Sequence, residues 1–367
     1  MMDDSQAARL DLKRRCQPIH GHGNTTPADL LGRTAAWCAE HDVDFDRYGS
    51  GSLIEIFEAT VSSLLGFAAG RFMPTGKLAQ NVAIKVWCER ASNAHFGMHP
   101  TSHLELHEGR AYQHLFGLRA TLVGPNRSPL LASHLRAVPE ALSALLVELP
   151  IREAGGQLPT WDELEELKGT ARRRGIRLHL DGARLWETAA HYGQSYEAIC
   201  AGFDSVYVSF YKGIGALSGA MLLGSRDFIE EAAVWQRRCG GELYTLAPNI
   251  ASAAMQFDER LARMPGYYAQ AQALATAVNS VDGIATLPAT PHTNMMHVFL
   301  PWDTELALDA RDRLAAETGI WLFNAVRPTD RPGHCFYEWY VGDAASDLTA
   351  EQITTLFARL HHLASEA

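Results

Sequence analysis

The stretch IRLHLDGARLWE at residues 176–187 decides how the rest of the chain is interpreted. Its first five residues alternate between apolar and basic side chains, as in a strand, and the glycine after the aspartate ends that pattern before a helical one begins. In open α/β sheets, ligands bind where strands end and helices begin. Asp181 and Arg184 at such a junction are either functional residues or an exposed ion pair in a turn, and this stretch alone favours the turn.

The size and composition are those of an ordinary globular protein. The chain has 367 residues, of which 47% are hydrophobic and 20% charged, and this length usually divides into two domains. The longest apolar runs, such as 216–223, are too short to span a bilayer, and the first residues lack the apolar core of a secretory signal. We therefore expect a cytoplasmic protein.

The charge and the cysteines exclude several classes of partner. The net charge of -10 provides no basic surface for nucleic acid or for an anionic membrane, so a small-molecule partner is expected. Six scattered cysteines without a CxxC pair argue against a disulfide framework and against a zinc site. We expect reduced, mostly buried thiols and no metal.

Strand and helix patterns alternate through the middle of the chain. We expect helices at 161–174 and after Arg184, together with short apolar strands at 118–124, 144–150, 176–181, 204–209 and 219–224. Such alternation predicts an α/β fold with a mainly parallel sheet covered by helices on both faces.

The expected domain boundary follows from a change in this pattern. Residues 227–280 are almost entirely helical in pattern, and a smaller α/β pattern follows them. We place a large domain at 1–250, with an irregular arm over about the first 30 residues, and a small C-terminal domain at 251–367.

Lys212 lies directly after an expected strand and before a glycine-rich turn, in the segment SFYKGIGALSG. Lysine is scarce in this chain, and Gly213 and Gly215 allow a ligand or another backbone to approach closely. In apolar surroundings the pKa of a lysine falls, which is what an amine needs to form a Schiff base with a carbonyl. The alternative is a solvated lysine on a loop.

Two further segments carry weaker signals. The turn MPTGKLAQN at 73–81 opens a helix with free N–H groups and a hydroxyl, which suits a phosphate, although it is not a P-loop. The segment SHLELHEG at 102–109 contains His103 and His107, either of which could contact a ligand or be an interior histidine.

In chain order, these motifs strongly resemble the threonine aldolase and β-eliminating lyase family of pyridoxal phosphate enzymes. The resemblance covers most of residues 45–245 and rests on the segments DRYGSGSLIEIFE, RFMPTGKLAQNVAIK, SHLELHEG, AGGQLP, HLDGARLWE and SFYKGIGALSGAMLLGS. It implies the fold of the aspartate aminotransferase type (fold type I), with a seven-stranded, mainly parallel sheet, and a homodimer or homotetramer.

The resemblance also implies a role for each candidate residue. Lys212 would hold pyridoxal 5'-phosphate covalently, and Asp181 would bond the pyridine nitrogen and keep it protonated, so that the ring accepts electrons from Cα. His103 would stack on the ring and could take a proton from a substrate hydroxyl. Arg184 would bind the substrate carboxylate in a bidentate fork.

The phosphate would be held at the start of a helix. Thr75, Gly76 and Lys77 would bind it mainly through backbone N–H groups, with help from Ser209.

The match weakens at two places. Family members usually have an arginine just before a C-terminal strand, where this chain reads GHCFYEWYVGD, and Arg327 or Arg331 could substitute for it. At 148–156 the chain reads ELPIREAGG, where the family commonly has Asn-Thr-His-Asn after the glutamate, so Arg152 could supply the missing charge to the substrate. These changes bear on the substrate more than on the cofactor.

Two smaller departures lie around the lysine and after the sheet. Tyr211 precedes the lysine where the aldolases have serine. The segment GGELY at 240–244 lacks an arginine that often reaches a neighbouring subunit's phosphate, for which Arg237 or Arg238 could substitute.

The implied reaction is cleavage of the Cα–Cβ bond of a β-hydroxy-α-amino acid to glycine and an aldehyde. The alternatives are β-elimination or another reaction at Cα with the same cofactor, and a non-catalytic scaffold that has kept the fold. A nicotinamide enzyme is disfavoured because no expected strand is followed by GxGxxG. The substrate side chain and the stereochemistry at Cβ stay open.

Overall fold

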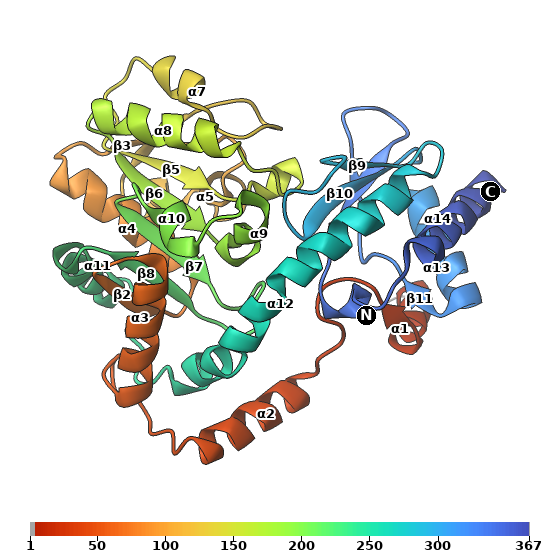
Figure 1. Cartoon of the computed structure of the whole chain (residues 1–367), viewed down its shortest axis with the longest axis horizontal. Coiled ribbons are helices and arrows are strands. Elements are labelled where there is room, and N and C mark those ends of the chain that lie inside the picture. The colour runs from red at the N-terminus through yellow and green to blue at the C-terminus, as the bar shows by residue number, and fades with distance from the viewer. Residues whose placement is uncertain (1–3, 367) are drawn as a thin grey trace. The chain divides into compact units, whose positions relative to one another are not determined.

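The structure is a computed structural model that describes residues 4–366. The chain forms two compact units. Figure 1 colours the chain by residue number, from red near the N-terminus to blue near the C-terminus. The sheet unit contains residues 26–153 and 157–263, and the C-terminal unit contains the described residues up to 25 together with 154–156 and 264 onward.

The sheet unit is built on seven strands in the order β2-β8-β7-β6-β5-β3-β4. Their bounds are β2 Ala69–Met73, β3 His95–Met98, β4 Arg119–Leu122, β5 Ala144–Glu148, β6 Arg177–Gly182, β7 Ser205–Ser209 and β8 Ala220–Gly224. β8 runs antiparallel to both of its neighbours, and every other pair is parallel. The predicted fold class, a mainly parallel seven-stranded sheet, is confirmed.

Helices cover both faces of this sheet. All residues of β5, β7 and β8 are buried, which requires cover above and below the sheet. The long helices of the unit are α2 Pro27–Glu40, α3 Ser52–Leu65, α4 Gly76–Arg90, α8 Trp161–Arg173 and α11 Arg226–Arg238. α4 and α11 pack together against the sheet, and the rings of Trp87 and Phe228 stack 4.6 Å apart between them.

Short elements connect the strands to these helices. They are α5 His103–Leu106, α6 Ala111–His114, α7 Ala132–Arg136, α9 Ala189–Tyr192 and α10 Tyr196–Cys200, with 3-10 turns at Arg152–Ala154 and Leu185–Glu187. The helix predicted after Arg184 is therefore a 3-10 turn followed by one short helix.

The C-terminal unit has an antiparallel sheet in the order β12-β13-β10-β9 and a parallel pair, β1 with β11. The strands are β1 Gln17–Pro18, β9 Ala285–Leu287, β10 Met295–Leu300, β11 Ile320–Trp321, β12 Arg327–Pro328 and β13 Cys335–Tyr340. Its helices are α1 Asp4–Arg15, α13 Thr304–Thr318 and α14 Ala350–Ser365, with a 3-10 turn at Asp343–Ala345. Helix α12, Ala247–Asn279, passes from one unit into the other.

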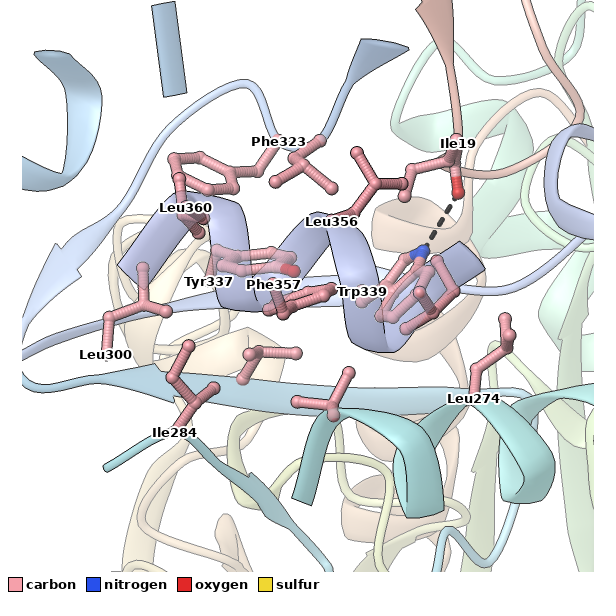
Figure 2. Packing of buried hydrophobic residues seen from close by; sticks show 14 of the residues in the cluster. Ile19, Leu274, Ile284, Leu300, Phe323, Tyr337, Trp339, Leu356, Phe357 and Leu360 are labelled. Atoms are coloured by element: carbon pink, nitrogen blue, oxygen red, sulfur yellow. Dashed lines mark hydrogen bonds between the residues drawn. The ribbon is translucent and has the colours of Figure 1, made fainter. Parts of the chain in front are cut away.

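The core of the C-terminal unit includes a residue from near the start of the chain. Figure 2 shows Ile19 beside Trp339, Phe357 and Leu356, and the indole Nε1 of Trp339 donates a 2.8 Å hydrogen bond to the Ile19 carbonyl. Apolar burial on this scale is the main stabilising term of such a unit. The first strand is thus an integral part of the C-terminal unit.

The expectation of an irregular arm over the first 30 residues is wrong for residues 4–15, which form α1. Arg9 of this helix pairs with Asp312 of α13 at 2.7 Å, and Leu12 packs near Ala315 and Trp321. The helix has few apolar side chains, so its sequence lacks a clear helical pattern, and contacts with the rest of the unit hold it in place.

The structure also bears on two exclusions. None of the six cysteines, all of which lie in the described part of the chain, forms a disulfide, and four of them are buried. Across residues 4–366 no helix combines the length and the apolar character that crossing a membrane would require.

Candidate active site

The candidate residues of the sheet unit gather where β5, β6 and β7 end. Asp181 lies near the end of β6, Ser209 is the last residue of β7, and Lys212 follows it in the turn toward β8. Because these strands are parallel, their carboxyl ends share one edge of the sheet, where open α/β folds bind ligands. Asp181 and Lys212 therefore lie at the same edge of the sheet, and their roles there stay predictions.

Lys212 is a partly buried amine among charged groups. Burial and the positive charge of Arg184 lower its pKa to about 8, although the carboxylates of Asp181 and Glu148 act in the opposite direction. Its Nζ lies 5.7 Å from the centre of the Tyr211 ring. An amine with a pKa near 8 is unprotonated in roughly a tenth of the molecules at pH 7, far more than an ordinary lysine, and in that form it can attack an aldehyde.

Two carboxyl groups lie side by side at this edge. Glu148 and Asp181 occupy paired positions on β5 and β6, so their side chains leave the same face of the sheet. Burial raises the pKa of both groups, to about 8 for Glu148, and the charge of Asp181 adds to the shift of Glu148. The positive charge of Lys212 opposes the shift of Asp181. Asp181 Oδ1 accepts a 3.1 Å hydrogen bond from the Ala183 N–H.

Glu148 is a member of this site that the sequence did not single out. Its Oε1 accepts the Arg152 N–H at 3.1 Å, and its Oε2 is buried without a hydrogen-bond partner in the described part of the chain. The signal available in the sequence was its position at the end of an apolar strand, one strand away from Asp181 in the sheet.

The turn before α4 has the geometry of an anion site. Thr75 caps the helix, its Oγ1 accepting from the Leu78 N–H at 3.2 Å. At Gly76 a Cβ would lie 2.0 Å from the Tyr207 Oη, so that only glycine fits. Ser218 of the β7–β8 turn donates to the Pro74 carbonyl at 2.8 Å, which fastens this turn to the segment that carries the lysine.

The side chain of Lys77 is directed to another carbonyl, that of His107, at 3.5 Å. The first-turn N–H groups of a helix have no partner within the helix and attract anions. Ser209 Oγ is buried at the end of β7.

The two candidate histidines have different partners in the structure. His103 Nδ1 lies 2.9 Å from Glu108 Oε1, and its charge acts on Asp181. His107 Nε2 instead lies 3.1 Å from Glu153 Oε1. The two rings are 5.1 Å apart between centroids. His103 is thus the histidine whose charge acts on the buried Asp181, and its predicted role of stacking on the ring stays a prediction.

Two arginines provide positive charge beside the lysine. The charges of Arg184 and Arg152 both lower the pKa of Lys212, which places both guanidinium groups in its surroundings. Arg152 also lies 3.5 Å from Glu153. This arrangement can bind the carboxylate of an amino acid.

The other arginines considered as substitutes have their own contacts. Arg327 stacks on the Phe336 ring at 4.8 Å within the C-terminal unit. In the sheet unit, Arg237 pairs with Glu242 at 3.0 Å, and the Arg238 guanidinium lies 4.8 Å from the centre of the Trp235 ring.

The donor set fits pyridoxal phosphate. A lysine with a lowered pKa, a buried carboxyl group beside it and a helix start fitted for an anion match the aldehyde, the ring nitrogen and the phosphate of that cofactor. The fold and the site together define a pyridoxal phosphate-dependent enzyme of fold type I.

Comparison with known proteins identifies the family. The model of the family described as "Beta-eliminating lyase" matches residues 23–301. A proposed L-allo-threonine aldolase from Listeria monocytogenes is 36% identical, with a TM-score of 0.90, over 97% of this chain and 99% of that chain. A proposed aromatic amino acid beta-eliminating lyase/threonine aldolase from Exiguobacterium is 36% identical, with a TM-score of 0.89, over the same shares of the two chains.

A curated relative gives the same result. Low-specificity L-threonine aldolase 1 of Arabidopsis thaliana is 26% identical over 311 residues, which are 81% of this chain and 85% of that protein. The chain belongs to the beta-eliminating lyase family and is a pyridoxal phosphate-dependent lyase.

Proposed function

We propose that the enzyme cleaves the Cα–Cβ bond of a threonine-like β-hydroxy-α-amino acid and releases glycine and an aldehyde. The observation that carries the proposal is the gathering of Lys212, Asp181, His103 and Arg184 at one edge of the sheet. The aldolases among the relatives support the choice of substrate class. Each residue supplies one function that the reaction requires.

The buried groups would serve the cofactor. Lys212 provides the amine that holds it, and Asp181 the carboxylate that bonds the ring nitrogen, while the start of α4 and Ser209 bind the phosphate. Pyridoxal phosphate, when bound, supplies a ring that stabilises negative charge at the substrate Cα.

The remaining groups would serve the substrate. Arg184 would hold the carboxylate, with Arg152 as a second positive charge near Lys212, and would so determine which bond at Cα is placed to break. His103 takes the proton of the β-hydroxyl group. As that proton leaves, the Cβ oxygen becomes a carbonyl, and the electrons of the Cα–Cβ bond move to Cα.

A second candidate reaction is β-elimination, for which the name of the Exiguobacterium relative gives a specific reason. We would assay glycine, aldehyde and ammonia separately with L-threonine, L-allo-threonine and a phenylserine. Glycine with an equal amount of aldehyde supports aldol cleavage. Ammonia with a keto acid, and no glycine from any substrate, would replace it with elimination.

The alternative of a non-catalytic scaffold can be tested with the same purified protein. Purified protein should show the visible absorbance of a lysine-bound pyridoxal group, and Lys212→Ala should lose it. A spectrum that lacks this band in both proteins would favour the scaffold.

We also propose a homodimer or homotetramer in the cytoplasm. Apolar side chains are strongly exposed on the sheet unit, with Phe45 76% and Tyr244 58% accessible. The ring of Tyr48 packs edge-on against that of Tyr244, 5.5 Å away, so these two exposed rings lie together. Exposed apolar patches mark interaction surfaces. Light scattering on the eluting protein decides between a monomer and either oligomer.

A further inference from the structure

A hydrogen-bonded chain connects the start of α4 to the candidate base His103. The Asn81 amide donates from Nδ2 to the Lys77 carbonyl at 2.8 Å and to Glu108 Oε2 at 2.7 Å. The other oxygen of the same carboxylate, Oε1, lies 2.9 Å from His103 Nδ1. The side chain of Glu108 is only 1% exposed.

The directions of these hydrogen bonds can be assigned from their chemistry. The Lys77 carbonyl can only accept, so the atom of Asn81 that faces it is the amide nitrogen. That nitrogen then also donates to Glu108, which leaves the carboxylate to accept from His103. An ionised carboxylate has no hydrogen to offer, so the proton between Glu108 and His103 lies on Nδ1.

We propose that Glu108, held by Asn81, is a positioning residue that fixes His103 as the tautomer with hydrogen on Nδ1. The unprotonated Nε2 is then the atom that takes the substrate hydroxyl proton, and this inference rests on the proposed function. As Nε2 gains that proton, the ring becomes a cation directly beside the Glu108 carboxylate, which stabilises it. Neither Glu108 nor Asn81 touches the reacting atoms.

The same series of hydrogen bonds links His103 to the helix start that would bind the phosphate. Asn81 lies on α4, one turn after the residues that would bind the phosphate, and it bonds to one of them, Lys77. The ring orientation of His103 is thus set by the same helix that would hold the phosphate.

The test combines a tautomer measurement with kinetics. Nitrogen-15 NMR of the histidine rings, with His103→Gln used to assign the signal, should show wild-type His103 protonated on Nδ1 at pH 8. In Glu108→Gln the signal should shift toward a mixture of tautomers. The kcat for glycine release should fall about tenfold or more while the KM changes by less than about threefold.

A matched control lies on α5, the short helix that carries His103. Glu105 bonds to Tyr112 Oη at 2.7 Å and to Arg110 at 2.6 Å, and Glu105→Gln removes one charge without touching His103. It should leave the tautomer and kcat as they are in the wild type. Asn81→Ala should give the same kind of loss as Glu108→Gln, with the cofactor absorbance retained as evidence of folding.

Two results would overturn the inference. One is a wild-type His103 signal with hydrogen on Nε2, and the other is a Glu108→Gln variant whose tautomer and kcat match those of the wild type. If the wild type releases no glycine at all, the proposed function fails, whereas the NMR measurement still decides the tautomer.

Discussion

At the scale of single residues, the charges around Lys212 determine when the enzyme can take up its cofactor. Only the unprotonated amine attacks the aldehyde, and the pKa of about 8 means that half of the amine is in this form at pH 8 and that the fraction levels off above roughly pH 9. The rate of absorbance change when pyridoxal phosphate is added to apoprotein should follow that curve.

The same measurement tests the cause of the shift. Because the positive charge of Arg184 lowers the pKa of Lys212, Arg184→Gln should move the curve to higher pH. A rate that keeps rising to pH 10 in the wild type would show an ordinary lysine instead.

A second residue-scale prediction concerns Glu148, whose pKa is raised by burial from its ordinary value near 4.5 to about 8. Its proton stabilises the folded state fully below pH 4.5, and this contribution is lost as pH rises through 8. Glu148→Gln cannot ionise, so between pH 5 and pH 8 it should lose less unfolding free energy than the wild type, by up to roughly 3 kcal/mol. Urea unfolding of both apoproteins at several pH values measures this difference. If the free energy of unfolding changed with pH in the same way for both proteins, the prediction would be contradicted.

At the scale of elements, the anion turn depends on the absence of a side chain at the start of α4. In Gly76→Ala the new Cβ would lie 2.0 Å from the Tyr207 Oη, so the turn or the tyrosine must move. We expect a loss of roughly 1–3 kcal/mol in stability and weaker binding of pyridoxal phosphate. Thermal unfolding and titration with the cofactor measure the two effects.

Gly169 in the middle of α8 is the control for this substitution. There the new Cβ would meet only the end of the Arg173 side chain, at 3.3 Å. Because glycine is a poor helix former, Gly169→Ala should be neutral or stabilising by up to about 1 kcal/mol. Equal losses in the two variants would refute the steric explanation at Gly76.

The elements also show what the sequence could and could not predict. The strands at 144–148, 177–182, 205–209 and 220–224 were predicted because each is a dense apolar run ending in a polar or glycine residue. β3, His95–Met98, was missed because it has four residues and includes Gly97, whose missing side chain leaves room for Leu142 and Leu145. A short strand with a glycine gives no periodic signal.

The candidate site shows the same limit. Asp181 and Lys212 could be chosen from the sequence because each stands at the end of an apolar strand, directly before a glycine, in a motif that resembles the family. Glu148 and Glu108 could not, because what makes them notable is a neighbour from another segment: Asp181 beside one, and Asn81 and His103 beside the other. Burial and pairing of carboxylates are properties of the folded chain.

At the scale of the whole molecule, the C-terminal unit needs a residue that lies about 300 positions earlier in the chain. Ile19 is 1% exposed within its core, and its carbonyl accepts the Trp339 indole hydrogen. Ile19→Ala removes buried methylene and methyl groups that no other segment replaces, so it should lower the free energy of unfolding by about 2–4 kcal/mol. Trp339→Phe removes the hydrogen bond and should cost about 1 kcal/mol. Because the two residues touch, the double variant should lose less stability than the sum of the two single losses.

Leu10→Ala, at a position that is 41% exposed, is the control and should change the free energy of unfolding little. If Ile19→Ala stayed within about 0.5 kcal/mol of the wild type in urea unfolding, the first strand would be a peripheral attachment and not part of the core.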